Sequence, residues 1–233
     1  MMSAYSQPSI FDGQVARRIA RLLIESGAVV ISPSETFSTA SASRRLPGIK
    51  VLVENLFYPD FGAFQTVCQT FDVYIRTHLQ SSSSMAQKVN PTNFDVVGCV
   101  QSGGTYIGVA LRGMLDDMPR VLVEKDGAIS GDGSLAGQRV ILIEDVVTTG
   151  GSCMRAIEAV RKAGGTVTAV VAMVEYGILG VRDRFTKLGA PLRVLTTMNV
   201  HVLQEALRLG KMHEGHAEEI LAWIDAEGVD LSS

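Results

Sequence analysis

The sequence predicts an α/β fold in which a mostly parallel central sheet is flanked by helices. Short apolar, β-branched segments alternate with helical segments along the second half of the chain, and this alternation is typical of parallel strands joined by right-handed crossovers. The chain has 233 residues, 46% of them hydrophobic, which is enough for one large core. We therefore expect a single domain over residues 1–233.

The first third of the chain predicts one helix, two short strands and a second helix. The first helix covers about residues 13–26, with Asp12 as its cap and Gly27 at its end. Its expected buried face consists of Val15, Ile19, Leu22 and Leu23. Strands at 29–31 and 49–53 enclose a segment rich in serine and threonine, 34–45. Apolar residues at helical spacing predict a helix over 64–79.

The sheet is expected to begin after residue 90. The predicted strands are 96–100, 120–123, 140–143, 167–174 and 192–196. Residues 101–105 form a glycine-bearing turn before a helix, and the backbone amides of such a turn can hold an anion. Residues 124–138 contain four glycines and few apolar side chains, so they predict either a mobile lid or a surface hairpin.

Residues 140–152 carry the strongest chemical signal in the sequence. Four apolar residues are followed by Glu144 and Asp145, then by small residues, and a helix is expected over 153–163. Free amides at the start of that helix favour a phosphate, and the loop glycines allow close approach. The two carboxylates need partners that donate hydrogen bonds to them or carry positive charge, such as two ribose hydroxyls or hydrated Mg²⁺. The stretch thus favours a ribose 5-phosphate, and it matches neither a Walker loop nor a Rossmann turn.

The run from Glu144 to Ser152 resembles the phosphoribosyl-pyrophosphate (PRPP) motif of type I phosphoribosyltransferases, and the orotate phosphoribosyltransferases look closest. The resemblance spans about residues 13–200. It implies that orotate and PRPP, with Mg²⁺, give orotidine 5′-phosphate and pyrophosphate. It further implies an N-terminal helix and hood (about 1–90), a PRPP-binding core (about 91–200), C-terminal helices (about 201–233) and a homodimer.

The resemblance also implies roles for individual residues. Glu144 and Asp145 would hold the ribose hydroxyls and, with Lys125, form the catalytic group. The remaining predicted contacts with PRPP are Val146, Val147, Thr148, Thr149, Gly150, Gly151 and Ser152. The predicted pyrophosphate loop is Ser102, Gly103 and Gly104, and the predicted base contacts are Thr148 and Tyr176. Mg²⁺ would be held mainly through substrate and water, with no direct protein ligand.

The sequence departs from the orotate enzymes in two places. Those enzymes generally carry four cationic residues in the 124–138 region, and this chain has Glu124, Lys125, Ala128 and Ser130 there. After the strand 167–174 they typically have Asp-Arg, whose guanidinium can pair with the orotate carboxylate, and this chain has Glu175-Tyr176. A further family arginine corresponds to Asn55. The candidate substitutes are Arg44, Arg45, Arg182 and Arg184.

These departures leave two alternatives open. One is a phosphoribosyltransferase for another base, because the arginine expected to bind orotate is missing. The other is a sensor that binds PRPP or a nucleotide without turning it over, because most of the lid cations are missing.

Composition and the remaining residues exclude several other classes. A net charge of −3 disfavours nucleic-acid binding, and no apolar run reaches the length of a membrane span. Without an N-terminal signal segment, the chain is expected to be cytoplasmic, with Cys68, Cys99 and Cys153 reduced and buried. His213 and His216 share a helical face but predict a solvated helix start rather than a metal site. Other packing residues are expected at Tyr106, Ala217, Ile220, Leu221, Trp223 and Ile224.

Overall fold

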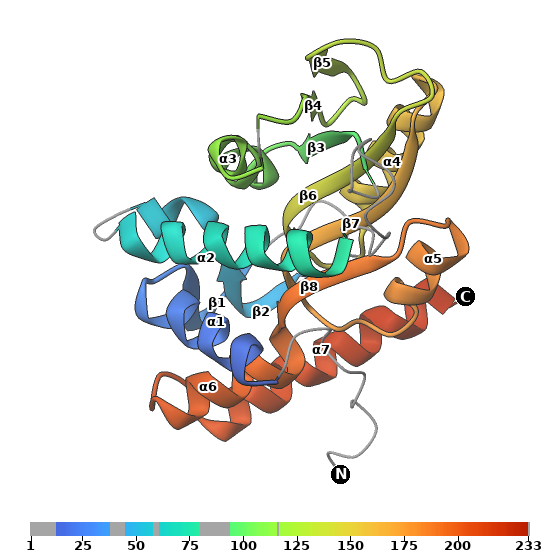
Figure 1. The fold of residues 1–233 in the computed structure, drawn as a ribbon. Helices are drawn as coiled ribbons and strands as arrows, with labels where there is room; N and C mark the ends of the chain where they lie inside the picture. Colours follow the sequence, from blue (N-terminus) through green and yellow to red (C-terminus); the bar gives the residue numbers. More distant parts are fainter. Residues whose placement is uncertain (1–12, 38–44, 58–60, 80–93, 116, 233) are drawn as a thin grey trace.

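A six-stranded sheet forms the centre of the molecule (Figure 1). The computed structural model describes residues 13–37, 45–57, 61–79, 94–115 and 117–232. The strand order is β5-β4-β3-β6-β7-β8, and all neighbours are parallel except β4 and β5. The strands are β3 Val96–Val100, β4 Arg120–Val123, β5 Ile129–Gly131, β6 Arg139–Val147, β7 Thr166–Glu175 and β8 Leu192–Thr197. The predicted mostly parallel sheet is therefore confirmed.

Strand β6 is longer than the sequence predicts. It continues past Ile143 to Val147, so Glu144 and Asp145 lie inside the strand and not beyond its end. The reason is β7, which pairs with β6 as far as Val147 and Glu175 and so keeps the backbone extended. Because side chains alternate along a strand, the two adjacent side chains leave the backbone toward opposite faces, but the Glu144 carboxyl turns back toward Asp145 and hydrogen-bonds with it.

The helices lie on both sides of this sheet. They are α1 Gly13–Glu25, α2 Phe61–Tyr74, α3 Gly103–Ala110, α4 Gly151–Lys162, α5 Val181–Lys187, α6 Leu203–Arg208 and α7 Glu214–Ser232. Short 3-10 helices cover Val53–Phe57 and Leu111–Gly113, and π-helical turns cover Ile75–Leu79 and Met198–Val202. Helix α3 approaches β6 on the side of Asp145, whereas α4 approaches it on the side of Glu144.

The front part of the chain forms a separate two-stranded sheet. Strands β1 Val29–Phe37 and β2 Leu46–Val51 are antiparallel and longer than predicted, and Val53 belongs to a 3-10 helix instead of the second strand. Helix α1 packs against β8, with Ile19 and Leu23 buried as predicted and Val15 and Leu22 partly buried. Asp12 and Arg44 lie outside the described residues, as does part of the serine-rich segment.

Helix α7 packs against β2, and this contact corrects the expectation of a solvated start for α7. His216 is only 1% exposed, and its ring fits against the backbone of Gly48. His213 is exposed, and its Nδ1 accepts the backbone N–H of His216 at 3.2 Å, which caps the helix. The predicted packing stripe is confirmed, since Ala217, Ile220 and Ile224 are buried and Leu221 is partly buried.

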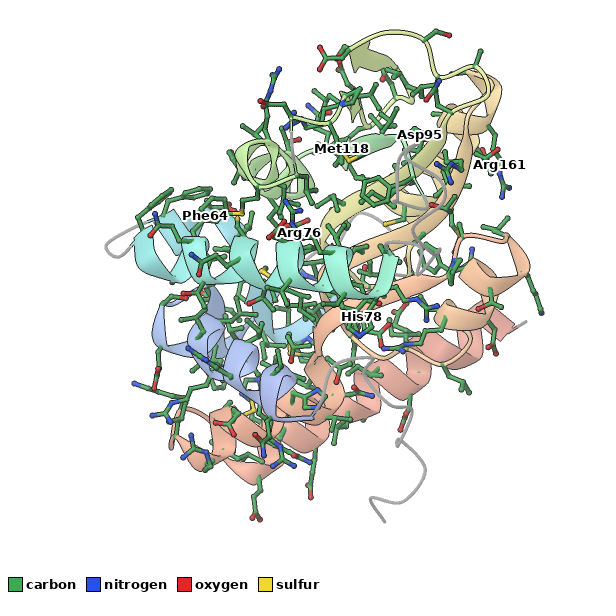
Figure 2. All side chains as sticks on the ribbon, in the orientation of Figure 1. Phe64, Arg76, His78, Asp95, Met118 and Arg161 are labelled. Atoms are coloured by element: carbon green, nitrogen blue, oxygen red, sulfur yellow. The ribbon has the colours of Figure 1, made fainter. Side chains whose placement is uncertain are left out.

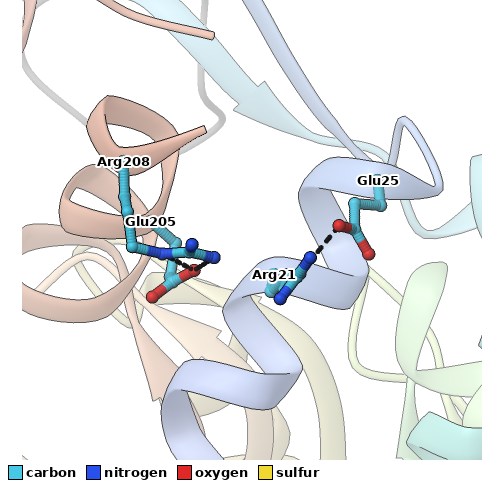
Figure 3. Close-up of polar contacts among 4 residues, drawn as sticks. All are labelled: Arg21, Glu25, Glu205 and Arg208. Atoms are coloured by element: carbon cyan, nitrogen blue, oxygen red, sulfur yellow. Dashed lines mark hydrogen bonds and ion pairs between the residues drawn. The ribbon is translucent and has the colours of Figure 1, made fainter. Parts of the chain in front are cut away.

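Polar contacts fix the edges of the core. Asp95, just before β3, binds the guanidinium of Arg139 at the start of β6 through both carboxylate oxygens, at 2.8 and 2.9 Å (Figure 2). Arg76, also labelled in Figure 2, lies in the π-helical turn that follows α2 and donates to the Met114 carbonyl. Two further ion pairs are drawn in Figure 3: Arg21–Glu25 on α1 is exposed, whereas Arg208–Glu205 on α6 joins an exposed arginine to a buried glutamate. An exposed pair such as Arg21–Glu25 stabilises a fold by only about 0–1 kcal/mol.

Two further expectations from the sequence can be compared with the structure. Cys68, Cys99 and Cys153 are free and buried, as predicted. In the described part of the chain, no helix has both the length and the apolar character needed to cross a membrane.

Candidate active site

The predicted phosphate loop lies between the end of β6 and the start of α4. Gly150 occupies the N-cap position of α4 with a φ of +81°, a conformation that L side chains rarely adopt. A Cβ at this position would also come within 2.9 Å of the Phe185 ring of α5. Thr148, Gly151 and Ser152 are partly exposed, whereas Thr149 is buried. The amides that open α4 are thus available at the surface for an anion.

Glu144 and Asp145 have different environments. Glu144 is 4% exposed, and it accepts the Asp145 backbone N–H at 3.0 Å and the Cys153 thiol at 3.5 Å. Burial, reinforced by the neighbouring Asp145 carboxylate, raises the pKa of Glu144 well above its usual value. Asp145 is half-buried and points toward α3. The pair therefore divides into a buried carboxyl whose neutral form is favoured by burial and a half-buried carboxylate that faces the turn before α3.

The predicted pyrophosphate loop meets Asp145 directly. Strands β3 and β6 pair from Val96–Val140 to Cys99–Ile143, which brings the two following turns together. A Cβ on Gly103 would overlap the Asp145 carboxylate, and one on Gly104 would overlap the Ile143 carbonyl. A side chain at position 104 would thus collide with backbone, and one at position 103 would displace the Asp145 carboxylate. The loop and the carboxylate, predicted from segments about forty residues apart, form one site.

The 124–138 segment is a hairpin at the edge of the sheet. Strand β5 pairs with β4 in antiparallel fashion between Val121–Gly131 and Val123–Ile129 (Figure 1). Of the two predicted forms, the structure has the hairpin; closure over a ligand stays a prediction. The Lys125 backbone N–H donates to the Gln101 side chain at 3.2 Å, which ties the hairpin to the turn before α3. The exposed Lys125 side chain thus starts beside the pyrophosphate loop.

Two residues of this site were missed as candidates from the sequence. Gln101 connects the hairpin to the loop, as described above. The hydroxyl of Thr105, in the first turn of α3, is buried and has no hydrogen-bond partner within the described residues. Both residues lie in the turn 101–105, so the signal was present, but polar residues are common in such turns and do not identify a role.

Tyr176 does not have the position expected of a base contact. It is 2% exposed and packs edge-on against Trp223 of α7, with ring centroids 5.9 Å apart. Burial also raises its pKa. The packing role expected for Trp223 is therefore observed, whereas Tyr176 faces the core. Tyr106 is exposed and contacts Phe57 at 5.2 Å between centroids.

The candidate substitutes for the missing arginine have separate partners. Arg182 of α5 binds the Glu175 carboxylate, with its Nε 2.7 Å from Oε1. The Nη1 atom of Arg184 lies 3.5 Å from the Thr149 carbonyl oxygen. Arg45 donates to the Thr36 carbonyl, and Asn55 donates to the Gly27 carbonyl. Of these residues, only those of α5 have contacts with the ends of β6 and β7.

A metal ion would find few protein ligands here. Among the described residues, no group of three His, Cys, Asp or Glu side chains is arranged to hold one. Asp145 is the carboxylate that the turn before α3 faces, and Glu144 is the one that the first turn of α4 contacts. This donor set fits a hydrated ion that a phosphorylated ligand brings with it, and it does not fit an all-protein cage.

Two phosphate-type turns around a carboxylate, at the carboxyl end of a parallel sheet, define the class as a type I phosphoribosyltransferase fold. No protein-family model matches the chain.

The relatives agree with this class and with the resemblance seen in the motif. The chain is 27% identical over 219 residues to the orotate phosphoribosyltransferase of Bacillus caldolyticus, covering 88% of this chain and 94% of that protein. Leishmania donovani UMP synthase has a TM-score of 0.71 at 21% identity, over 90% of this chain and 42% of that one. The Aeropyrum pernix orotate phosphoribosyltransferase has a TM-score of 0.62 at 22% identity, and the match covers 82% of this chain and 99% of that one. Over most of its length, this chain is therefore similar to the orotate phosphoribosyltransferases.

Proposed function

We propose that this protein is an orotate phosphoribosyltransferase that transfers the 5-phosphoribosyl group from PRPP to orotate. The observation that carries the proposal is the contact between the Gly103 backbone and the Asp145 carboxylate, next to the phosphate loop that opens α4. PRPP has a phosphate at one end, two ribose hydroxyls in the middle and a pyrophosphate at the other end. The site offers amides, a carboxylate and amides in the same order.

The chain's own residues would act mainly by positioning and charge. Thr148 to Ser152 bind the 5′-phosphate, and Ser102 to Gly104 bind the pyrophosphate through backbone amides. Asp145 accepts the ribose hydroxyls and stabilises positive charge that develops at the ribose C1. The orotate ring nitrogen forms the new bond to C1 while the bond to pyrophosphate breaks. The Lys125 ammonium stabilises the charge that accumulates on the leaving pyrophosphate.

Glu144 has a different role in this proposal from the one expected from the motif. Because Glu144 is buried and accepts the Asp145 backbone N–H, it supports the position of Asp145 and is not a second ligand of equal standing. Binding of a cationic or hydrated group can change this balance by favouring the charged form.

Mg²⁺ is the proposed cofactor. Asp145 and the two turns would hold it through substrate oxygens and water. When bound, it neutralises pyrophosphate charge and so assists departure of the leaving group.

We also propose a homodimer located in the cytoplasm. Exposed Phe61 and Tyr106 both contact Phe57, and Val109 of α3 is exposed on the same helix as Tyr106. An apolar patch of this kind beside the pyrophosphate loop is typical of a surface covered by another chain. Light scattering at micromolar concentration tests the dimer, and a monomeric mass contradicts it.

The enzyme activity is tested by following orotate absorbance with PRPP and Mg²⁺. Consumption of orotate with release of one pyrophosphate per nucleotide supports the proposal. Turnover with another base and none with orotate would leave a transferase of different specificity. PRPP binding by calorimetry without turnover of any base would indicate the sensor, which the paucity of cations in the hairpin favours as the second candidate.

A further inference from the structure

Glu175 and Arg182 form a buried ion pair whose place in the fold has no packing explanation. Glu175 is the last residue of β7, and its side chain is 5% exposed. Arg182 donates from both Nε and Nη2 to the same oxygen, Oε1. A pair of this kind loses hydration on burial, so apolar residues of similar size are often as stable or more so. Stability alone therefore does not account for the pair.

The pair lies beside the phosphate loop. Val147 of β6 is the register partner of Glu175, and the Tyr176 N–H donates to the Val147 carbonyl at 2.9 Å. The phosphate loop begins at the next residue, Thr148. Asp145, Val147 and the partner position Glu175 share one face of the sheet, because parallel neighbours in register point the same way. Arg182 therefore lies on the Asp145 side of the sheet, one strand away from the loop.

Arg182 also has hydrogen-bonding capacity left over. The Nε and Nη2 atoms of Arg182 each donate one bond to Glu175, and the Nη1 of Arg182 has no hydrogen-bond partner within the described residues. The side chain is 24% exposed, so this group is accessible to a small ligand. Glu175 holds the guanidinium plane in place, and a fixed guanidinium favours a planar carboxylate over other anions.

We propose that Arg182, held in place by Glu175, recognises the carboxylate of the base that accepts the phosphoribosyl group. The inference rests on the proposed function, and it supplies the cation that Tyr176 cannot provide. Arg182 is the binding residue, and Glu175 is a positioning residue that acts through it. The cation reaches the site from the first turn of α5 and not from the strand end.

The experiment compares two nucleotides that differ only in this carboxylate. Calorimetry measures the binding of orotidine 5′-phosphate and of uridine 5′-phosphate, so no turnover is needed. We expect the protein to prefer orotidine 5′-phosphate by about tenfold or more, the size of a charge-assisted hydrogen bond. Arg182→Gln should remove this preference by weakening orotidine 5′-phosphate alone. Lys187→Gln removes the same charge from an exposed position of the same helix, and it should change neither affinity.

The positioning role is tested by conservative variants. Arg182→Lys keeps the charge but loses the planar guanidinium that can donate two parallel hydrogen bonds, so it should recover only part of the preference. Glu175→Gln should weaken orotidine 5′-phosphate binding less than Arg182→Gln does, with uridine 5′-phosphate unchanged. Thermal unfolding of each variant confirms that it is folded, and Arg182→Lys keeps the test possible if Arg182→Gln does not fold.

Two outcomes would overturn the inference. One is a protein that binds both nucleotides equally well, and the other is a preference that survives in Arg182→Gln. Neither outcome decides the proposed function, which depends on orotate turnover in the absorbance assay. Conversely, a protein without turnover that still loses its nucleotide preference in Arg182→Gln supports the inference and contradicts the enzyme activity.

Discussion

The two ends of the site differ in how they are built. At the proposed phosphate end, the residues assigned to each ligand group are consecutive in sequence, in the turns 101–105 and 147–152. At the proposed base end, the polar groups come from β7 and α5 and meet only through tertiary packing. On this proposal, local backbone chemistry is enough to recognise phosphate, whereas recognition of the base depends on which side chains the fold brings together. The following predictions test this difference, from the largest expected effect to the smallest.

Asp145→Asn should have the largest effect, because the Asp145 carboxylate lies against the Gly103 turn and is proposed to accept the ribose hydroxyls. Loss of this charge should lower kcat/KM by about 10²- to 10³-fold, the range for removal of one preorganised electrostatic group. Steady-state kinetics with PRPP varied gives the measurement. A variant that keeps full PRPP affinity and turnover would show that the phosphate end does not depend on Asp145.

Gly103→Ala should disrupt the same centre from the other turn. A Cβ would overlap the Asp145 carboxylate, so either the loop or the carboxylate must shift. A displacement of about 1 Å in a catalytic group can lower the rate about 10²-fold. The matched control is Gly113→Ala, since no atom lies within 4 Å of its added Cβ. Equal activity of the two variants would contradict the observed contact between loop and carboxylate.

Lys125→Ala should lower kcat by about tenfold and raise KM for PRPP, as expected for loss of one charged hydrogen bond. Its effect should be smaller than that of Asp145→Asn because the hairpin holds Lys125 by its backbone and leaves the side chain exposed. Lys162→Ala, an exposed lysine of α4, is the control. No change in kcat for Lys125→Ala would show that this side chain of the hairpin does not contribute to catalysis.

The local structure of the proposed phosphate end was predictable from the sequence, and the contacts at the proposed base end were not. Glycines, hydroxyls and carboxylates in a fixed order between an apolar strand and a helix predicted a strand-turn-helix over residues 144–152 without any tertiary contact, and the ligand stays a prediction. The different environments of Glu144 and Asp145 were not predicted, because they depend on β7, which extends β6 through both residues. A strand end predicted from hydropathy alone cannot include that pairing.

Side-chain direction explains the other misses. Tyr176 was expected near the base because it follows β7, but its ring packs against Trp223, almost fifty residues later in the chain. His216 was expected in solvent, and the backbone of Gly48 in the distant β2 gives it a buried position. Both errors concern contacts between segments far apart in sequence, whereas the helical stripe of α7 that surrounds His216 was predicted correctly.

The unequal carboxylates predict a pH dependence of stability. The folded protein binds the Glu144 proton more tightly than the unfolded chain, because burial raises the pKa of Glu144 above its ordinary value of 4.5. Its contribution to stability is thus fully present below that pH and is lost as the pH rises toward the folded pKa, with a slope of at most about 1.4 kcal/mol per pH unit. Glu144→Gln should remove this part of the pH dependence.

Urea unfolding of wild type and Glu144→Gln between pH 4.5 and 8 gives the comparison. The variant should gain stability relative to wild type as the pH rises. For Glu158→Gln, at an exposed position of α4, the free energy of unfolding should depend on pH in the same way as for wild type. Parallel curves for Glu144→Gln would mean that Glu144 is ionised in the folded protein, and the two carboxylates would then be equivalent ligands.

Tyr176→Phe should have the smallest effect, and it tests whether the base end is built by tertiary packing. The aromatic ring stays in place against Trp223, so the free energy of unfolding should change by no more than about 1 kcal/mol. Since the buried side chain faces the core, kcat and KM for orotate should stay within about twofold of wild type. A selective rise in KM for orotate would instead show that the tyrosine hydroxyl reaches the base, and the strand end would then carry the recognition that we propose for α5.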